Sequence, residues 1–355
     1  MNKKIKEKYK ISFAEMAISS KGNNKFLEAV NYIIDWDSID EVFKKYTKTS
    51  NLGASAYSNI LLFKILLLQT WYNLSDPAVE EQINDRISFI KFLGISIDSP
   101  TPDYSTISRF RNFLLTKNLY DKLFKEVNKQ LVDKKLIVKN GAIVDATVIT
   151  SARRPRKTIK GELTVDRKED EIKEENKVEI TYSDDKEAAW LIKRGRFHYG
   201  YKGHNLVNYD GYFLGGHVTG ANISDINQLE EMINESDIEK GTHILADKGY
   251  MSKKNVELLK TLGMKDGIMR KKLKNKELTE EEKIKNKEIS KIRYRVEQSF
   301  GLLKKHFGYE RMRYIGKAKC NFENTIKMMS FNIKKAMYSI AKDYAMKNKK
   351  IYIAI

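Results

Sequence analysis

Residues 142–149 read Ala-Ile-Val-Asp-Ala-Thr-Val-Ile and give the clearest indication of the fold. The stretch is apolar and rich in β-branched residues, and the turn dipeptide Asn140-Gly141 precedes it, so a strand is predicted here. Alternation along a strand puts Asp145 on the same face as Thr147. A carboxylate in this position is costly to bury unless it is paired or bound to a metal ion. An ordinary ion pair with an Arg, or exposure near the strand end, is the alternative explanation.

Strand-like and helix-like segments alternate downstream of this strand. Strands are predicted over 197–207, 212–220, 242–246 and 267–269, with the hairpin dipeptide Asp210-Gly211 between the first two. Helices are predicted over 227–233, 253–262, 288–307 and 321–344. Strands interleaved with helices in this order indicate a mixed α/β sheet. Residues 151–196 are dense in charges of both signs and are expected to form a mobile surface insertion.

The chain before this region predicts helices only. The spacing of Phe26, Val30 and Ile34 is helical, and the stretch 57–72 is apolar nearly all round, which is typical of a buried helix. A third helix is expected to begin with Asp76 as N-cap and Pro77 in its first turn, and to run to about Leu93. Two more are expected, one after Pro102-Asp103 and one whose apolar face includes Leu119, Leu123, Phe124, Val127 and Leu131.

These segments predict three parts. Residues 1–136 are expected to form an all-helical N-terminal domain. Residues 137–335 are expected to form an α/β domain that includes the charged insertion, and residues 336–355 a C-terminal tail.

Composition favours a polyanionic partner and a reducing compartment. The formal charge is +19, and such a field attracts nucleic acid, although a generally lysine-rich proteome would produce the same excess. Cys320 is the only cysteine, which excludes a disulfide framework and a cysteine zinc site. Residues 1–10 lack an apolar signal core, and the longest apolar run, residues 60–68, is too short to cross a bilayer. A soluble, cytoplasmic protein is expected.

Two further carboxylates occur where functional acids are common. Asp247 follows a short apolar strand and precedes Lys248-Gly249, a frequent position for a site residue, although a capping or turn aspartate is the alternative. Glu297 lies on a predicted helix. At 100° per residue, Arg293, Glu297 and Lys304 share a stripe about 80° from the apolar stripe of that helix. A surface ion pair between Arg293 and Glu297 is the ordinary alternative.

Each acid alone is a weak signal, but the combination is informative. Asp145, Asp247 and Glu297 supply three oxygen donors without clustered Cys or His, which suits a hard cation, Mg²⁺ or Mn²⁺. Two such ions about 4 Å apart can clamp the attacking and leaving oxygens of a phosphodiester displacement.

Five segments in this α/β region resemble the insertion-sequence transposases of the IS-four/IS-five superfamily, whose catalytic domain has the ribonuclease H-like fold. They are Val144–Thr147, Phe197–His204, Val218–Asp225, Ala246–Tyr250 and Arg293–Lys304, and they occur in the family's order. Residues Pro102–Arg111 resemble the helical domain that precedes the family's core. The family's third-acid signature is Tyr, Arg, Glu and Lys at fixed spacing. Arg293, Glu297 and Lys304 match it, but Ser290 stands at the tyrosine position, which leaves the role of that tyrosine open.

The resemblance implies a DDE transposase, in which residues 1–136 would be the DNA-binding domain and residues 137–335 the catalytic domain with a ribonuclease H-like mixed sheet. Asp145, Asp247 and Glu297 would bind two Mg²⁺ or Mn²⁺ ions, free a 3′-OH at the element's end and direct it at a target-DNA phosphate. Arg293 and Lys304 would contact phosphates near that end. The partners implied are the terminal inverted repeats and target DNA, bound by a homodimer. The protein would be cytoplasmic and associated with the nucleoid.

The helix over residues 105–116 is our candidate for entry into a DNA groove at the terminal repeats. Its polar residues are Ser105, Ser108, Arg109 and Arg111. Simple packing in a helical bundle, with the two arginines in solvent, explains the same pattern equally well.

Two other functions share these features. A metal-dependent nuclease with the same fold but without strand transfer would use the same three acids. A DNA-binding regulator derived from a transposase would keep the basic charge but would not need the acids.

Overall fold

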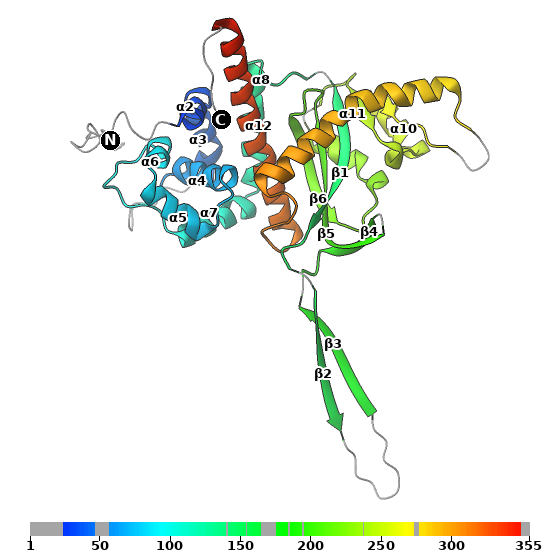
Figure 1. Cartoon of the computed structure of the whole chain (residues 1–355), viewed down its shortest axis with the longest axis horizontal. Coiled ribbons are helices and arrows are strands. Elements are labelled where there is room, and N and C mark those ends of the chain that lie inside the picture. The colour runs from blue at the N-terminus through cyan, green and yellow to red at the C-terminus, as the bar shows by residue number, and fades with distance from the viewer. Residues whose placement is uncertain are drawn as a thin grey trace, which may run out of the picture.

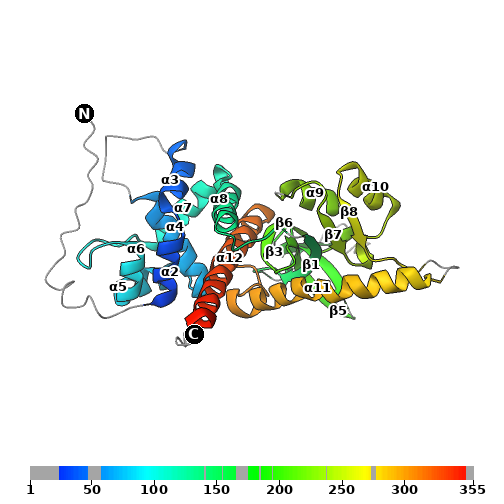
Figure 2. The same ribbon diagram turned by 90° about the horizontal axis from the view of Figure 1, so that it is seen from above.

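The computed structural model describes residues 24–46, 57–139, 141–153, 155–164, 175–183, 185–193, 195–236, 238–272 and 277–348, with the backbone alone for 156–183 and 342–348. The chain has a helical part and an α/β part, and the long helix α12 (Lys317–Asn348) lies between them (Figures 1 and 2). No helix in these ranges combines the length and the apolar character needed to cross a membrane.

The helical part contains α2 to α8. Their bounds are Lys25–Ile33 (α2), Trp36–Lys44 (α3), Asn59–Trp71 (α4), Asp76–Asp85 (α5), Ile87–Leu93 (α6), Tyr104–Thr116 (α7) and Leu119–Asp133 (α8). Helix α4 is buried around most of its circumference, as its apolar sequence predicted. Even Lys64 is buried, with Nζ 4.5 Å from the centre of the Trp36 ring and 3.1 Å from the Phe92 carbonyl oxygen.

The prediction of a single helix from Asp76 to Leu93 is wrong, because two helices, α5 and α6, cover this stretch. Arg86 has an extended backbone, with φ −107° and ψ 109°, which ends α5 and begins α6. The predicted N-cap is also corrected. Ser75 caps α5 by accepting a hydrogen bond from the Ala78 N–H, and Asp76 is the first helical residue. The carboxylate of Asp76 is therefore free to pair with another element of the chain.

The α/β part is built on a mixed six-stranded sheet in the order β4-β5-β1-β7-β8, with β6 also paired to β5. The strands are β1 (Ala142–Thr150), β4 (Ala189–Lys193), β5 (Arg196–Val207), β6 (Phe213–Gly220), β7 (His243–Ala246) and β8 (Lys265–Ile268). Strand β1 pairs antiparallel with β5 and parallel with β7, and β7 pairs parallel with β8. The predicted mixed sheet is confirmed, and Gly211, with φ 77°, makes the turn between β5 and β6.

Helices cover both faces of this sheet. Figure 2 shows α9 (Leu229–Glu235) and α10 (Lys253–Thr261) on one side and α11 (Glu280–Phe307) on the other. Short 3₁₀ turns, η1 (Asp225–Asn227) and η2 (Lys248–Tyr250), precede α9 and α10. Helix α11 begins eight residues before the predicted position 288, with Thr279 as N-cap and Glu282 completing a capping box.

The two parts of the chain share one hydrophobic core. The larger core cluster includes Phe63 of α4, Ile143 of β1 and Phe331 of α12. The Trp71 indole N–H also donates to the Ser330 carbonyl oxygen at 2.9 Å, which ties α4 to α12. Helix α12 continues unbroken through residue 336, where the sequence had suggested the start of a tail. A boundary near residue 136 therefore separates helices from sheet, but it does not separate two cores.

The charged insertion expected over residues 151–196 contains regular structure. Strands β2 (Arg156–Thr164) and β3 (Glu175–Ser183) pair antiparallel as a ribbon that projects from the body (Figure 1), and β4 joins the main sheet. The base of the insertion is anchored by Asp185, which is buried and accepts hydrogen bonds from the Ser151 hydroxyl at 3.0 Å and the Tyr201 hydroxyl at 2.5 Å. Charge density concealed this β pattern because polar side chains predominate on its strands.

Candidate active site

Two of the predicted acids lie side by side at the centre of the sheet. In the parallel pairing of β1 with β7, Val144 is the partner of Ala246, so the residues that follow them, Asp145 and Asp247, are neighbours. Asp145 is in the middle of β1, whereas Asp247 comes directly after β7. The Asp247 carboxylate caps η2 and accepts a hydrogen bond from the Gly249 N–H at 2.7 Å. Sequence reasoning placed Asp145 within a strand and Asp247 at the C-terminal end of another, and their adjacency follows from the parallel pairing.

The orientation of Asp145 follows from strand alternation. Val144 belongs to the smaller core cluster, which lies with α9 and α10. The next residue, Asp145, therefore faces the opposite side of the sheet, where α11 packs. The ion pair described below agrees with this placement.

Glu297 lies on α11 at the edge of the helix surface that covers the sheet. The predicted apolar stripe is confirmed, because Ile289, Val296 and Leu303 are buried. Glu297 itself is exposed. One turn earlier, a guanidinium nitrogen of Arg293 lies 3.5 Å from Oδ2 of Asp145. Residues four apart on a helix are neighbours, so this contact brings Glu297 close to the two aspartates.

The surroundings of Asp145 disfavour the ionised form of its carboxyl group. Burial, together with the nearby charges of Asp247 and Glu297, raises the pKa of Asp145 to about 6, against the lowering effects of Arg293 and the Ala146 N–H. Two groups beside it are buried without a hydrogen-bond partner, the Tyr250 hydroxyl and Nε of Arg293. Burial also raises the pKa of Tyr250, and the charges of Asp145, Asp225 and Asp247 add to that rise.

These residues fit a divalent cation by their chemistry. The three carboxylates repel one another, and one of them is largely desolvated, so a bound cation would relieve both penalties. Their donors are all oxygen, which is the preference of Mg²⁺ and Mn²⁺. Asp145, Asp247 and Glu297 are therefore the residues that could hold such an ion.

A tighter cluster of potential metal ligands occurs elsewhere. Within the described ranges, His217, Glu231 and Glu235 have candidate ligand atoms all within 4.8 Å of one another. Both ring nitrogens of His217 already have acceptors, Glu235 at 2.8 Å from Nδ1 and Gln228 Oε1 at 2.9 Å from Nε2. Burial alone would lower the pKa of His217, but these hydrogen bonds and the two glutamates outweigh it and raise the pKa. Both ring nitrogens of His217 are thus already engaged by side-chain oxygens, which does not favour this histidine as a metal ligand.

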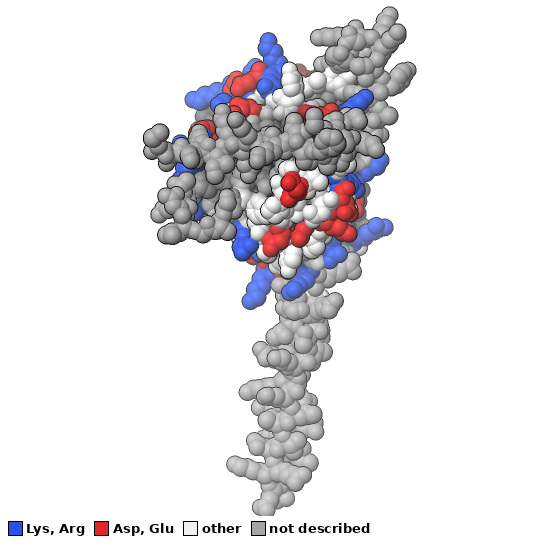
Figure 3. Space-filling model, turned by 90° about the vertical axis from the view of Figure 1, so that its left-hand side faces the viewer, with Lys and Arg blue, Asp and Glu red and all other residues white. Residues whose placement is uncertain are grey.

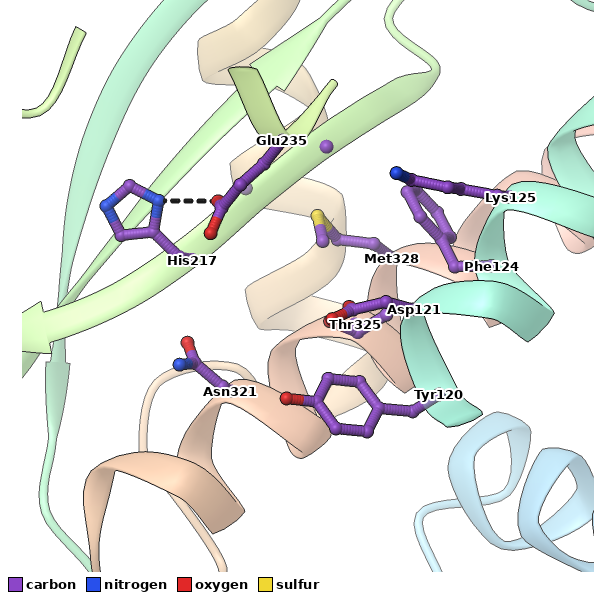
Figure 4. Close-up of a pocket in the computed structure, with 11 residues that line it drawn as sticks. Tyr120, Asp121, Phe124, Lys125, His217, Glu235, Asn321, Thr325 and Met328 are labelled. Atoms are coloured by element: carbon purple, nitrogen blue, oxygen red, sulfur yellow. Dashed lines mark hydrogen bonds and ion pairs between the residues drawn. The ribbon is translucent and has the colours of Figure 1, made fainter. Parts of the chain in front are cut away.

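The same histidine lines a cavity of about 140 Å³ between α8, β6 and α12 (Figure 4). Asp121 and Glu235 approach this cavity from α8 and α9. Burial and, after it, the charge of Glu235 raise the pKa of Asp121 to about 6. None of the three acids around Arg293 lines this cavity, so it is separate from the candidate active site.

The two basic residues predicted beside Glu297 have different surroundings. Arg293 is largely buried against Asp145. Lys304 is half-buried, with Nζ 3.4 Å from the Val148 carbonyl oxygen, and burial followed by repulsion from Lys193 lowers its pKa. Ser290, at the position of the family tyrosine, is exposed and lies 3.9 Å from the Met269 sulfur.

The polar residues predicted on the groove-entry helix do not share one environment. Arg109 is exposed, and its guanidinium donates to the hydroxyls of Ser105 at 3.3 Å and Thr106 at 2.9 Å. Ser108 is half-buried. The prediction that Arg111 enters a DNA groove is wrong, because this residue is buried and only 5% exposed. Its guanidinium pairs with Asp76 and lies 4.8 Å from the centre of the Tyr314 ring.

The surface around these helices is not uniformly basic. Figure 3 shows the face on the side of the N-terminal helices, where the coloured Asp and Glu side chains gather near the middle and Lys and Arg lie mainly towards the edges. Charge therefore does not favour contact with DNA phosphates near the middle of the described part of this face.

Two residues near the acids were not singled out from the sequence. Tyr250 follows Asp247 in η2, and Asp225 in η1 pairs with Lys202 at 2.8 Å. Both lie in segments that carried the family resemblance, so their place in a motif was the available signal. Their proximity to Asp145 depends on contacts between distant strands and could not be read from spacing.

Comparisons with known proteins identify relatives of this chain. Residues 138–333, more than half of the chain, match the family model of the transposase DDE domain, and residues 15–113 match that of a transposase domain, DUF772. The transposase for insertion sequence element IS1106 from Neisseria meningitidis serogroup B is 37% identical over 233 residues, which cover 64% of this chain and 76% of that protein.

One solved structure is similar over most of the chain. It is the cryo-EM structure of the piggyBac transposase synaptic complex with hairpin DNA, with a TM-score of 0.38, 10% identity and coverage of 92% of this chain and 80% of that chain. A similarity at this level supports no argument about the present protein.

Proposed function

Because the chain belongs to the family of transposases with a DDE domain, we propose that it binds the terminal inverted repeats of an insertion sequence, cuts DNA there and joins the ends to target DNA. The observation that carries the proposal is the grouping of Asp145 and Asp247 on paired strands with Arg293, one turn from Glu297, 3.5 Å from Asp145. Such a group of acids is of little use to a protein that only binds DNA. A regulator that has lost catalysis is therefore the weaker alternative.

We assign the three carboxylates to metal binding. When bound, two Mg²⁺ or Mn²⁺ ions would supply Lewis-acid stabilisation of the attacking and leaving oxygens of the phosphodiester. Asp145 and Asp247 hold their positions through the sheet, and Glu297 through the packing of α11 on that sheet. Rigid elements of this kind fix ligand positions more precisely than loops do.

The basic residues act on the substrate and on the acids. Arg293 offsets the charge of Asp145, and its guanidinium is assigned to a phosphate oxygen bound beside that acid. Lys304 is half-buried without a carboxylate within 4.0 Å in the described ranges, so an incoming phosphate would supply its missing counter-charge. Both residues are assigned to the backbone of the cleaved strand and carry no sequence preference.

Recognition of the terminal repeat is assigned to one exposed and two half-buried polar residues of α7. Arg109, Ser105 and Ser108 lie on this helix, and Arg109 is free of any carboxylate within 4.0 Å in the described chain. A homodimer, with one subunit for each end of the element, is part of the proposal.

A joining assay separates the three candidate functions. A labelled duplex with the inverted repeat is incubated with the full chain, Mg²⁺ and a supercoiled target plasmid. A transposase produces end cleavage and covalent joining of the end to the plasmid. Cleavage without joining would favour the nuclease, and binding without cleavage would favour the regulator.

A further inference from the structure

A groove of about 820 Å³ lies between α11 and α12, on the side of α11 away from the acids. Its α11 wall is formed by residues at helical spacing on one face: Arg295, Gln298, Ser299, Leu302 and His306. Arg295 precedes Glu297 by two residues, which is about 200° around the helix. The groove and the acid stripe therefore lie on nearly opposite sides of α11.

Positive charge gathers in this groove. Arg295 enters from α11, and Lys334 and Lys335 enter from α12. The described residues place no carboxylate within 4.0 Å of any of these three cations. Lys335 donates to the carbonyl oxygen of Asp210, the one acidic residue among those that line the groove.

The cations are held close enough to repel one another. Burial and, after it, the charge of Arg295 lower the pKa of Lys335 to about 8. Burial also lowers the pKa of His306, and Lys334 adds to that effect. Desolvated like charges without counter-ions are unfavourable, so an anion in the groove would relieve this cost.

The wall between the cations is apolar and aromatic. Nζ of Lys335 lies 4.9 Å from the centre of the Tyr212 ring and 5.7 Å from that of Phe331. Leu302 is 37% exposed, which is high for a leucine beside a core. Apolar surface flanked by cations matches a sugar-phosphate backbone, whose deoxyribose is apolar and whose phosphates are anionic.

From this arrangement we propose that the α11–α12 groove binds the backbone of a DNA segment away from the scissile phosphate, so that α11 lies between two stretches of DNA. The inference rests on the proposed function only in taking DNA as the polyanion. It assigns Arg295, Lys334 and Lys335 to phosphate contacts that Arg293 and Lys304 cannot make, because those two lie on the acid side of the helix.

The first test measures binding without catalysis. The triple variant Arg295→Gln/Lys334→Gln/Lys335→Gln and a matched control, Lys253→Gln/Lys254→Gln/Lys260→Gln, change charge equally. The control lysines are exposed on α10, across the sheet from the groove. Affinity for a fluorescent 40-base-pair duplex is measured in chelator from low to high salt. The groove variant is expected to lose about two to three units of the slope of log K against log[salt], as expected for two or three lost phosphate contacts. The control is expected to match the wild type.

Equal slopes for the groove variant and its control would overturn the proposal. So would a change in oligomeric state of the groove variant with unchanged DNA affinity, which would make the groove a protein interface. A wild-type chain that binds no duplex under these conditions would instead contradict the proposed function. These outcomes are distinguishable because no cleavage is required.

A second test does not depend on removing the lysines. Cys320 is the only cysteine and is fully buried, so a cysteine placed at Leu302 can be labelled selectively with an iron chelate. Hydroxyl radicals from that label are expected to cut bound inverted-repeat DNA at positions distinct from the scissile phosphate. Lys253→Cys, labelled in the same way, is the control. The proposal would be overturned if the label at position 302 gave no cuts, or gave cuts no stronger than those of the control.

Discussion

The guanidinium of Arg293 lies 3.5 Å from Oδ2 of Asp145, so α11 is joined to the central strand β1 by an ion pair at the acidic site. The spacing of Arg293 and Glu297 alone also fits a surface ion pair within the helix. The observed partner instead connects the helix that bears the third acid to the strand that bears the first. This relationship links the geometry of the acids to the packing of α11.

Replacing Arg293 is expected to impair cleavage more than binding. Arg293→Ala removes the positive charge next to Asp145 and one phosphate contact, so single-turnover cleavage of a bound end should fall at least about tenfold. The loss should be equal for two ends of different sequence, because backbone contacts carry no sequence information. Lys291→Ala, at an exposed position on the same helix, is the control. A loss confined to one end sequence would contradict the assignment.

Arg109 is expected to contribute to recognition of the repeat. Arg109→Ala should weaken binding to the inverted repeat by about 1 to 3 kcal/mol, with little effect on a scrambled duplex, if the side chain contacts a base edge. Binding curves at matched salt for the two duplexes measure the difference. Equal losses on both would assign Arg109 to the backbone, and no loss on either would leave α7 a packing helix.

Arg111 is expected to affect stability and not recognition. Arg111→Ala would leave Asp76 without its guanidinium partner and expose a gap beside Tyr314, at a cost of about 3 kcal/mol. Denaturant unfolding of the variant and of Arg109→Ala measures the contrast. Equal stability of the two variants would show that the buried ion pair contributes little.

Asp121 is expected to make stability depend on pH. Its pKa in the folded chain, about 6, is above the usual value of 3.8 because of burial and Glu235. An acid with a raised folded pKa favours folding only while protonated, so stability is lost as pH rises from about 4 through 6. At pH values above 7, Asp121→Asn should therefore raise the free energy of unfolding by about 1 to 2 kcal/mol, and the melting temperature with it. Near pH 4 this gain should vanish.

The matched control for this change is Asp133→Asn, at an exposed position at the end of the same helix. Its effect on the melting temperature should be small at every pH. A gain for Asp121→Asn that does not vary with pH would rule out the titration of this carboxyl as its cause.

Features set by local periodicity were predictable from the sequence. The strand around Asp145, the apolar stripe of α11 and the buried helix α4 all follow from the spacing of apolar residues over one or two turns or a few strand positions. The candidate acids could be chosen for the same reason, since each occupies a marked position in a local element.

Features set by distant partners were not predictable in this way. Arg111 looks solvent-exposed on a helical wheel, and only its pairing with Asp76 on α5 and its contact with Tyr314 near α12 explain its burial. Likewise, the contact between Arg293 and Asp145 requires the packing of α11 on the sheet. Spacing defines a face of an element, whereas the partner of that face depends on the tertiary fold.

Metal-dependent cleavage by variants of the acids tests the central claim most directly. Wild type, Asp145→Asn and Glu297→Gln are compared on an inverted-repeat duplex in Mg²⁺, in Mn²⁺ and in chelator, and their affinity for the same duplex is measured in parallel. The account predicts cleavage by the wild type only with a divalent ion, loss of cleavage by at least about a thousandfold in both variants, and DNA affinity within a few-fold of wild type. Substantial cleavage in chelator, or by either variant with Mg²⁺, would contradict the assignment of these carboxylates to the active site.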